Sequence, residues 1–310
     1  MTDTTLIVGA GPAGVSCAIW LQQLGYRAVL IDKHTQCGGL QLQNPWTNTW
    51  IATSANASGA DVAQALHYNA LRQGCELHLG QTAVQAQRTN EGWQAALSSG
   101  QVLEGRFLVL AGGVVPRTGG LLTRGSMLIG PGRVISESNF EGKSVAILGG
   151  GDNAFENYQF IKKRGAKAVH IYARTLRARA ELLEAVPPEH VTEGAYTLRE
   201  EASSVNGVGY DRIVVLYGYE TNRASLLGLE PLMRPGGFVA TDEQCRTSLH
   251  GVWAIGELAQ RAHPCCVTAM ADGVVAAKSI QRELEASKTA RYRGMLRRTG
   301  SLLSKLASGS

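Results

Sequence analysis

The chain has 310 residues, of which 44% are hydrophobic and 37 are glycine, a composition typical of an α/β protein long enough for two domains. No segment resembles a signal peptide and no apolar run approaches the roughly 20 residues of a membrane-spanning helix, so we expect an intracellular protein whose six cysteines form no disulfide framework. The net charge is +5, but residues 286–310 hold six basic residues and no acid, which leaves −1 elsewhere. The basicity belongs to the tail, and we expect neither a nucleic-acid partner nor a metal.

The first 32 residues predict a strand, a glycine-rich turn, a helix and a second strand. Residues 4–8 form the first strand, the turn runs Gly9-Ala10-Gly11-Pro12-Ala13-Gly14, and the second strand ends in Asp32, eighteen residues beyond Gly14. In this order the turn places a pyrophosphate on the positive end of the helix, and the carboxylate accepts hydrogen bonds from a ribose. The segment is therefore predicted to bind a dinucleotide, and a glycine-rich turn without a ligand is the alternative.

The following segments complete the predicted first domain. Residues 33–40 form a loop whose paired glycines indicate close approach to a ligand. A helix is predicted over 59–73, a strand over 76–79, a hairpin over 92–103 and a buried strand over 107–113 that ends in glycines.

A second copy of the opening pattern starts at residue 144. A strand leads into Gly149-Gly150-Gly151-Asp152-Asn153-Ala154, then a helix to Arg164 and a strand over 168–172. Arginines over 174–179 follow this strand in place of an acid, which suits a ribose 2′-phosphate or another phosphate. A solvated basic loop is the alternative. Later, residues 251–257 predict a buried strand that ends in Glu257, and a helix is predicted over 272–285.

With these motifs in order, residues 4–285 resemble the thioredoxin-reductase-like branch of flavoproteins with two dinucleotide-binding domains. The resemblance implies an α/β fold with two Rossmann-like FAD/NAD(P)-binding domains. FAD is then expected on residues 1–118 plus 219–285, and NADPH on a shortened insert at 119–218, with 286–310 as a basic tail. The cofactor-binding residues that the motifs and the resemblance predict are Gly9, Gly11, Pro12, Ala13, Gly14, Asp32, Lys33, Gly39, Leu40, Ala111, Gly112, Gly149, Gly151, Asn153, Ala154, Arg174, Arg179, Gly256 and Glu257.

Two departures from this family concern chemistry. The redox CxxC expected before the second fingerprint is missing from residues 130–136, and the two consecutive arginines after the second strand appear as Arg174-Thr175, which puts NADPH binding in doubt. A subgroup that lacks the CxxC, the diflavin-linked disulfide oxidoreductases, carries a second FAD and is the group this chain most resembles. The second site is therefore expected to take FAD or NADP(H).

The chemistry is predicted at His263-Pro264-Cys265-Cys266, where the resemblance places the start of a helix beside the flavin. Two thiols near a helix N-terminus, with His263 to move the proton, can exchange electrons with the ring. The pair can close a disulfide with each other, or one can pair with Cys37. The alternative is that Cys265 and Cys266 are packing residues.

The tail predicts a basic amphipathic helix, because its apolar residues recur at helical spacing among arginines and lysines. It is suited to an anionic membrane surface, which would make the protein peripheral on the inner face of a membrane and a quinone a plausible acceptor, or to a partner subunit. The preferred function is thiol oxidation by FAD. An NADPH-dependent ferredoxin or flavodoxin reductase and a flavin-binding sensor are the alternatives, and the resemblance implies a homodimer.

Overall fold

The computed structural model describes residues 3–307, which divide into two compact units. The first unit contains Asn48–Gly113 together with the two chain ends, up to Leu42 and from Thr221 onward. The second contains Val114–Glu220 and the short segment Gln43–Thr47. That segment joins the second unit through Trp46, whose ring lies edge-on to Phe160 with centroids 4.6 Å apart. Residues 43–47 fall within the range predicted for the first domain, because nothing in their local sequence distinguishes them.

The first unit is built on a parallel five-stranded sheet with the strand order β20-β9-β1-β2-β5. Its central strand is β1, in which all four residues are buried, and Leu6 lies opposite Val29 on one side and Leu108 on the other. Such continuous apolar runs are typical of parallel strands covered on both faces. The strands are β1 (Thr5–Val8), β2 (Ala28–Asp32), β5 (Glu76–Leu79), β9 (Phe107–Leu110) and β20 (Val252–Ala254).

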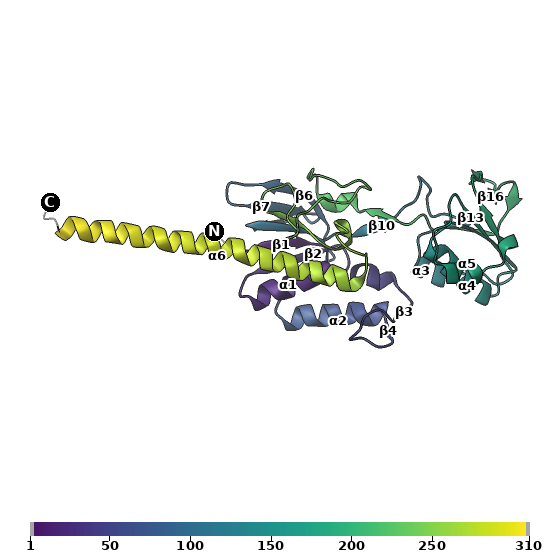
Figure 1. The fold of residues 1–310 in the computed structure, drawn as a ribbon, viewed down its shortest axis with the longest axis horizontal. Coiled ribbons are helices and arrows are strands. Elements are labelled where there is room, and N and C mark those ends of the chain that lie inside the picture. The colour runs from purple at the N-terminus through teal and green to yellow at the C-terminus, as the bar shows by residue number, and fades with distance from the viewer. Residues whose placement is uncertain (1–2, 308–310) are drawn as a thin grey trace. The chain divides into compact units, whose positions relative to one another are not determined.

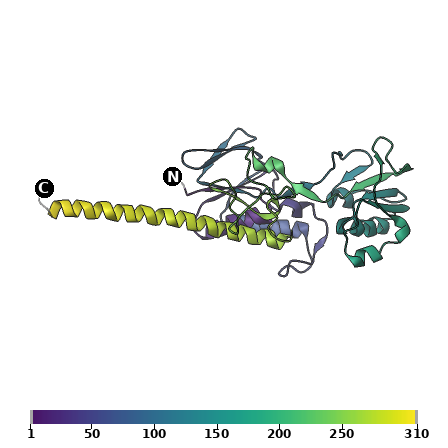
Figure 2. The same cartoon turned by 45° about the horizontal axis from the view of Figure 1, so that its top comes forward.

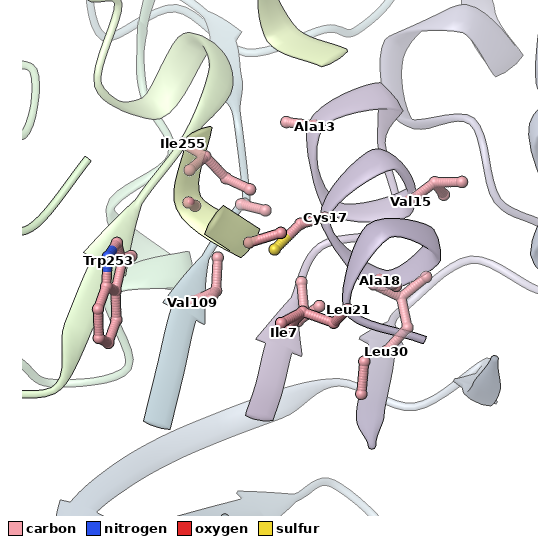
Figure 3. Packing of buried hydrophobic residues seen from close by; sticks show 14 of the residues in the cluster. Ile7, Ala13, Val15, Cys17, Ala18, Leu21, Leu30, Val109, Trp253 and Ile255 are labelled. Atoms are coloured by element: carbon pink, nitrogen blue, oxygen red, sulfur yellow. The ribbon is translucent and has the colours of Figure 1, made fainter. Parts of the chain in front are cut away.

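Helices cover one face of this sheet and an antiparallel sheet covers the other (Figure 1). The helices are α1 (Pro12–Gln23), α2 (Gly59–Arg72) and α6 (Cys266–Ala307), and the antiparallel strands are β6 (Ala83–Arg88), β7 (Trp93–Leu97) and β8 (Val102–Gly105). Figure 3 shows Cys17 of α1 packed among Ile7, Val109 and Ile255. Helices α1 and α6 lie very close together, since a Cβ on Gly273 would stand 2.4 Å from the Ala13 carbonyl oxygen.

Helix α6 joins two helices that the sequence predicted separately, one over 272–285 and one in the tail. It begins at Cys266, near the start that the resemblance implies and six residues before Asp272, and it continues without a break to Ala307. Gly294 and Gly300 therefore do not end the helix, although glycine weakens one. Figures 1 and 2 show the last turns of α6 projecting past α1. The side chains of residues 290, 291 and 294–310 lie outside the described part of the chain, so the amphipathic face predicted for the tail stays a prediction.

The second unit repeats the architecture with a parallel sheet of order β11-β18-β12-β13-β14. Its strands are β11 (Met127–Ile129), β12 (Ser144–Leu148), β13 (Ala168–Ala173), β14 (Val191–Glu193) and β18 (Arg212–Val215), and its helices are α3 (Arg133–Ser136), α4 (Asp152–Lys163) and α5 (Ala180–Glu184). Strands β15 (Leu198–Arg199), β16 (Ser204–Val205) and β17 (Val208–Gly209) form a small antiparallel sheet.

Two further pairs of short strands form separate two-stranded sheets. β10 (Val114–Pro116) pairs with β19 (Tyr219–Thr221) where the chain enters and leaves the second unit, and β3 (Thr47–Asn48) pairs with β4 (Ala57–Ser58). Among residues 3–307, no helix is both long and apolar enough to cross a membrane.

Candidate functional site

The turn between β1 and α1 can be made only with glycine at two of its positions. Gly9 has φ +114°, and a Cβ there would lie 2.3 Å from the Ala111 carbonyl oxygen. A Cβ on Gly14 would lie 1.9 Å from the Gly9 carbonyl oxygen. These contacts bring helix, turn and β9 together, which is the close packing that a dinucleotide turn requires. Gly112 is constrained in the same way, because its Cβ would meet Ser225 at 2.0 Å.

The N-terminus of α1 is shaped to receive an anion. Gly11 is its N-cap with an extended backbone, Pro12 occupies the first turn, and that turn holds no acidic residue. A Cβ on Gly11 would have only the Gly39 Cα nearby, at 3.8 Å, so the space in front of the helix is bounded by glycine backbone. Free N–H groups and the helix dipole favour a phosphate at such a point.

Asp32 points back into this turn from the end of β2. Its Oδ2 accepts a 2.6 Å hydrogen bond from the Ala10 N–H, and its Oδ1 accepts one of 2.8 Å from the His34 N–H. The His34 ring nitrogen Nδ1 lies 2.9 Å from the same Oδ1. The carboxylate is therefore fixed at the turn, in the position where such a residue meets a ribose.

The loop after β2 closes over the turn through its glycines. The Gly38 N–H donates to the Ala10 carbonyl at 2.8 Å, and Gly39 approaches Gly11. Lys33 and Leu40, both predicted to bind the cofactor, are exposed on this loop. Cys37 is fully buried, and burial, followed by the negative charge of Asp32, raises the pKa of its thiol to about 12. It belongs to the core cluster that also holds Cys17 and Cys75.

The second glycine-rich turn has the same geometry. A Cβ on Gly149, where φ is +155°, would lie 2.4 Å from the Leu216 carbonyl oxygen, and one on Gly150 would lie 2.1 Å from that of Thr175. Gly151, the N-cap of α4, has no atom within 4 Å of its Cβ position. Ala154 at the third small position is buried. The Asn153 carbonyl accepts a 2.7 Å hydrogen bond from Asn157 of the same helix.

The arginines expected to bind phosphate here differ in their surroundings. Arg179 is bound to carboxylates of α4: its Nε lies 3.0 Å from Asp152 Oδ2 and its Nη2 lies 3.4 Å from Glu156 Oε1. Arg174 is exposed, and its positive charge acts on the Tyr217 hydroxyl. The positive charge of Arg179 is thus partly neutralised by carboxylates of the same unit.

Gly256 joins the first turn to the start of α6. A Cβ on Gly256 would lie 2.9 Å from the Ala13 Cβ and 3.7 Å from that of Ala269. The Ser16 hydroxyl of α1 also donates to the Met270 carbonyl at 2.8 Å. Residues far apart in the sequence, the α1 turn and the first turns of α6, therefore meet at this glycine.

A small pocket at this junction holds polar groups that the sequence analysis did not single out. Asp272 Oδ2 accepts from the Gly256 N–H at 3.1 Å, and its Oδ1 accepts from Arg261 Nη1 at 2.9 Å. Burial raises the pKa of Asp272, and it also raises the pKa of Glu257. The pocket is lined by Gly256, Glu257, Gln260, Arg261, Ala262, Pro264, Thr268, Ala269 and Asp272. Arg261 and Asp272 belong to no sequence motif. Only the packing of α6 against residues 256–261 shows that they share this pocket.

The cysteine pair stands at the start of α6, beside this pocket. Both thiols are free and partly exposed. Burial raises the pKa of Cys265, but hydrogen bonds from Thr268 and the Val267 N–H outweigh it, so that pKa lies below its ordinary value of 9.0. Burial raises the pKa of Cys266 to about 11. His263 is exposed, and its carbonyl accepts from the Thr268 hydroxyl at 2.7 Å.

The structure brings some predicted site residues together and separates others. Cys265 and Cys266 stand at the start of α6, where the charge of Glu257 acts on both thiols and Thr268 hydrogen bonds to the His263 carbonyl. This end of α6 meets the α1 turn through Gly256. Cys37 lies near Asp32 but with its thiol buried in the core. Fold and site together define an α/β protein with two Rossmann-like dinucleotide-binding domains, both of them discontinuous in sequence.

Comparison with known proteins confirms that class. The model of the pyridine nucleotide-disulphide oxidoreductase family matches residues 3–273. The chain belongs to this family and is a flavin-dependent oxidoreductase of the thioredoxin-reductase-like type. The predicted fold class is thereby confirmed.

Individual relatives support the same conclusion. Thioredoxin reductase of Bacillus subtilis (strain 168) is 23% identical over 306 residues, covering 90% of this chain and 94% of the relative. A ferredoxin–NADP reductase of Lactococcus lactis subsp. cremoris (strain SK11) is 26% identical with the same coverage. The crystal structure of Lactococcus lactis thioredoxin reductase (FR conformation) superposes with a TM-score of 0.76 at 18% identity, covering 90% of this chain and 98% of that one, which is a likeness of fold alone.

Proposed function

We propose that the protein exchanges electrons between a dithiol or disulfide substrate and FAD through Cys265 and Cys266, in the thiol-oxidising direction. The observation that carries this is the position of the pair. The helix that begins at Cys266 packs through Ala269 on Gly256, and Gly256 packs on Ala13 in the first turn of α1. A thiol pair is thus built next to the dinucleotide turn, with one thiol set to ionise.

The first unit has the features that FAD needs. The glycine-bounded N-terminus of α1 would hold the pyrophosphate and Asp32 the ribose, with Gly256 beside Ala13 of the same helix turn and Glu257 next to it in the chain. When bound there, FAD accepts or donates the electron pair. The residues of this chain bind it, orient it and hold the proton.

Paired serine substitution tests the role of the thiols. Cys265→Ser with Cys266→Ser, in protein that retains its flavin, is expected to abolish reduction of the flavin by dithiols. Cys75→Ser is the matched control, because that thiol lies in the core and should not affect turnover. Unchanged dithiol-driven reduction in the double variant would refute the proposal.

For the second unit we propose a bound nucleotide in which FAD is favoured over NADP(H). Arg179, the arginine expected at a 2′-phosphate, already pairs with Asp152 and Glu156. Release of two FAD per chain on denaturation would support the diflavin arrangement, in which the usual CxxC is dispensable. Release of one FAD per chain would instead indicate that the second unit binds NADP(H).

The second candidate function is an NADPH-dependent ferredoxin or flavodoxin reductase, which needs no cysteines. It is favoured by the relatives of that activity, which match 90% of the chain. Rapid anaerobic bleaching of the flavin by NADPH, unaffected by the double serine substitution, is the result expected of it.

We also propose that the tail binds an anionic membrane surface from the cytoplasmic side and that a quinone is then the electron acceptor. The support is the run of six basic residues without an acid in 286–310 and the helix that reaches Ala307. Flotation with anionic vesicles should be lost on truncation after Glu285 and at high salt. A truncation that leaves flotation intact but splits a homodimer in sedimentation would assign the tail to a partner subunit.

A further inference from the structure

Cys265 and Thr268 bind each other reciprocally at the start of α6. The helix begins at Cys266, so Cys265 is the N-cap and Thr268 the third helical residue. The Cys265 N–H donates to Thr268 Oγ1 at 3.2 Å, and the Thr268 N–H donates to Cys265 Sγ at 3.5 Å. This is the bonding pattern of a capping box, with a thiol where a hydroxyl or carboxylate usually stands.

The Thr268 hydroxyl has one proton and several acceptors around it. It donates to the His263 carbonyl at 2.7 Å, while Cys265 Sγ lies 3.4 Å away. A charged sulfur is a stronger acceptor than a neutral carbonyl, so the proton can turn to Sγ when Cys265 ionises. The thiolate then has the hydroxyl and the helix-end N–H as donors.

Cys266 lies inside the helix and has a different electrostatic setting. The nearby charged groups that act on it are Cys265 of its own helix and Glu257 of the preceding 3-10 turn (Gly256–Leu258), and both oppose its ionisation. Glu257 opposes the ionisation of Cys265 as well, but there the donors from Thr268 and Val267 prevail. Two neighbouring thiols are therefore unlike: burial opposes the ionisation of Cys266, whereas the Thr268 hydroxyl and the N–H groups of Val267 and Thr268 favour that of Cys265.

We propose that Thr268 is a positioning residue that makes Cys265 the charged member of the pair and Cys266 the neutral one. This role rests on the proposed dithiol-oxidising function. Starting from the oxidised pair, a substrate thiolate attacks Cys266 Sγ, the bond between Cys265 and Cys266 breaks, and Cys265 leaves as the thiolate that Thr268 holds. The leaving sulfur with the lower pKa departs faster.

The second substrate thiol completes the exchange. It gives up its proton and attacks the substrate sulfur of the mixed disulfide, and Cys266 leaves and takes a proton. The substrate dithiol has then lost two electrons to become a disulfide, and the cysteine pair has gained them as one thiolate and one thiol. The flavin of the proposed function is the oxidant that restores the pair.

The test is the pH dependence of alkylation by iodoacetamide in the flavin-containing full chain, read at Cys265 by peptide mass spectrometry. In a Cys266→Ser background the midpoint should lie below 9.0 with Thr268 present. Thr268→Val should raise the midpoint by about one unit, roughly a tenfold loss of reactivity at neutral pH, whereas Thr268→Ser should restore it. Equal profiles for threonine and valine would overturn the role.

A measurement without substitution guards against a variant that fails to fold. In the reduced wild-type chain at neutral pH, Cys265 should be alkylated before Cys266, and the reverse order would overturn the proposal. Alkylation does not require turnover. If Cys265 and Cys266 behave alike while their double serine variant still abolishes dithiol-driven flavin reduction, Thr268 has no such role and the proposed function stands.

Discussion

The two glycine-rich turns share their backbone hydrogen bonds but differ in the side chains around them. The Gly9 N–H donates to the Ile31 carbonyl at 2.8 Å, as the Gly149 N–H does to Tyr172 at 2.9 Å. In each turn the next residue's carbonyl accepts from the loop after the second strand, from Gly38 at 2.8 Å in one and Arg177 at 2.7 Å in the other.

The difference lies in charge. The first turn has a carboxylate held at the Ala10 N–H, a glycine loop and no acid in the first turn of α1. The second has Asp152 in the first turn of α4, with Arg179 bound to it. Backbone contacts thus fix the shape of both turns, whereas the surrounding side chains decide which nucleotide each can hold.

Substitution at the third small residue of each turn, Gly14 in the first and Ala154 in the second, should give the largest difference in stability between the turns. Gly14→Ala places a Cβ 1.9 Å from the Gly9 carbonyl oxygen, so we expect a loss of at least about 3 kcal/mol in the free energy of unfolding and loss of flavin. The matched change Ala154→Gly should cost about 1 kcal/mol. Thermal unfolding with flavin release measures both, and similar losses would mean that the turns are not packed differently.

Asp32→Ala should have the next largest effect. It removes the acceptor for the Ala10 and His34 N–H groups and for a ribose, so FAD affinity should fall at least about tenfold, given the roughly 1.5–3 kcal/mol of a hydrogen bond to a charged group. Asp211→Ala is the control. Asp211 likewise accepts from a backbone N–H, that of Ser144, but at the start of β12, away from the turn. Flavin titration should show a normal affinity for it.

The buried thiol of Cys37, in the loop after β2, makes the stability of the first unit depend on pH. Its native pKa of about 12 lies above the unfolded value of 9.0, so the native state keeps a proton that the unfolded chain loses. Stability should therefore fall as pH rises above 9.0, by up to about 1.4 kcal/mol per pH unit from this thiol. Cys37→Ala should make the free energy of urea unfolding fall less steeply between pH 9 and 10 under reducing conditions. Part of the slope should remain, because burial also raises the pKa of Cys17, Cys75, Cys245 and Cys266.

Cys265→Ser is a control for which the expected effect of pH on stability has the opposite sign to that of Cys37→Ala. The native pKa of Cys265 lies below 9.0, so its contribution to stability grows as pH rises through that native pKa. Removing it should lower stability at alkaline pH. A Cys37→Ala profile as steep as the wild type would show that other groups cause the alkaline loss.

Arg179→Ala should have the smallest effect on nucleotide binding. Because Asp152 and Glu156 already hold this side chain at the half-exposed edge of α4, we expect less than about a threefold change in the affinity of the second unit for NADPH. Arg174→Ala, at the exposed neighbour, is the comparison. A tenfold loss confined to NADPH and absent for NADH would assign Arg179 to a 2′-phosphate and reverse the preference for FAD.

Much of this molecule follows from the sequence alone. Both strand–turn–helix–strand units, the packing glycines and the alternation of strands and helices were predicted, because they depend on local rules of backbone conformation and hydrophobic period. The start of α6 lies six residues before the Asp272 predicted from the pattern and close to the place that the resemblance implied, because a cysteine is not among the residues that usually signal an N-cap. A helix in the tail was predicted from its apolar spacing, but its continuity with the helix before Glu285 was not.

Tertiary structure alone decided which distant residues share a site. Gly256 meets Ala13 and Ala269, Arg261 meets Asp272, and residues 43–47 join the second unit, because burying apolar surface brings together segments whose local sequences carry no sign of each other. It also made two adjacent cysteines unlike. The sequence determines that two thiols are adjacent, whereas the hydrogen bonds at Thr268 lower the pKa of Cys265 and burial raises that of Cys266.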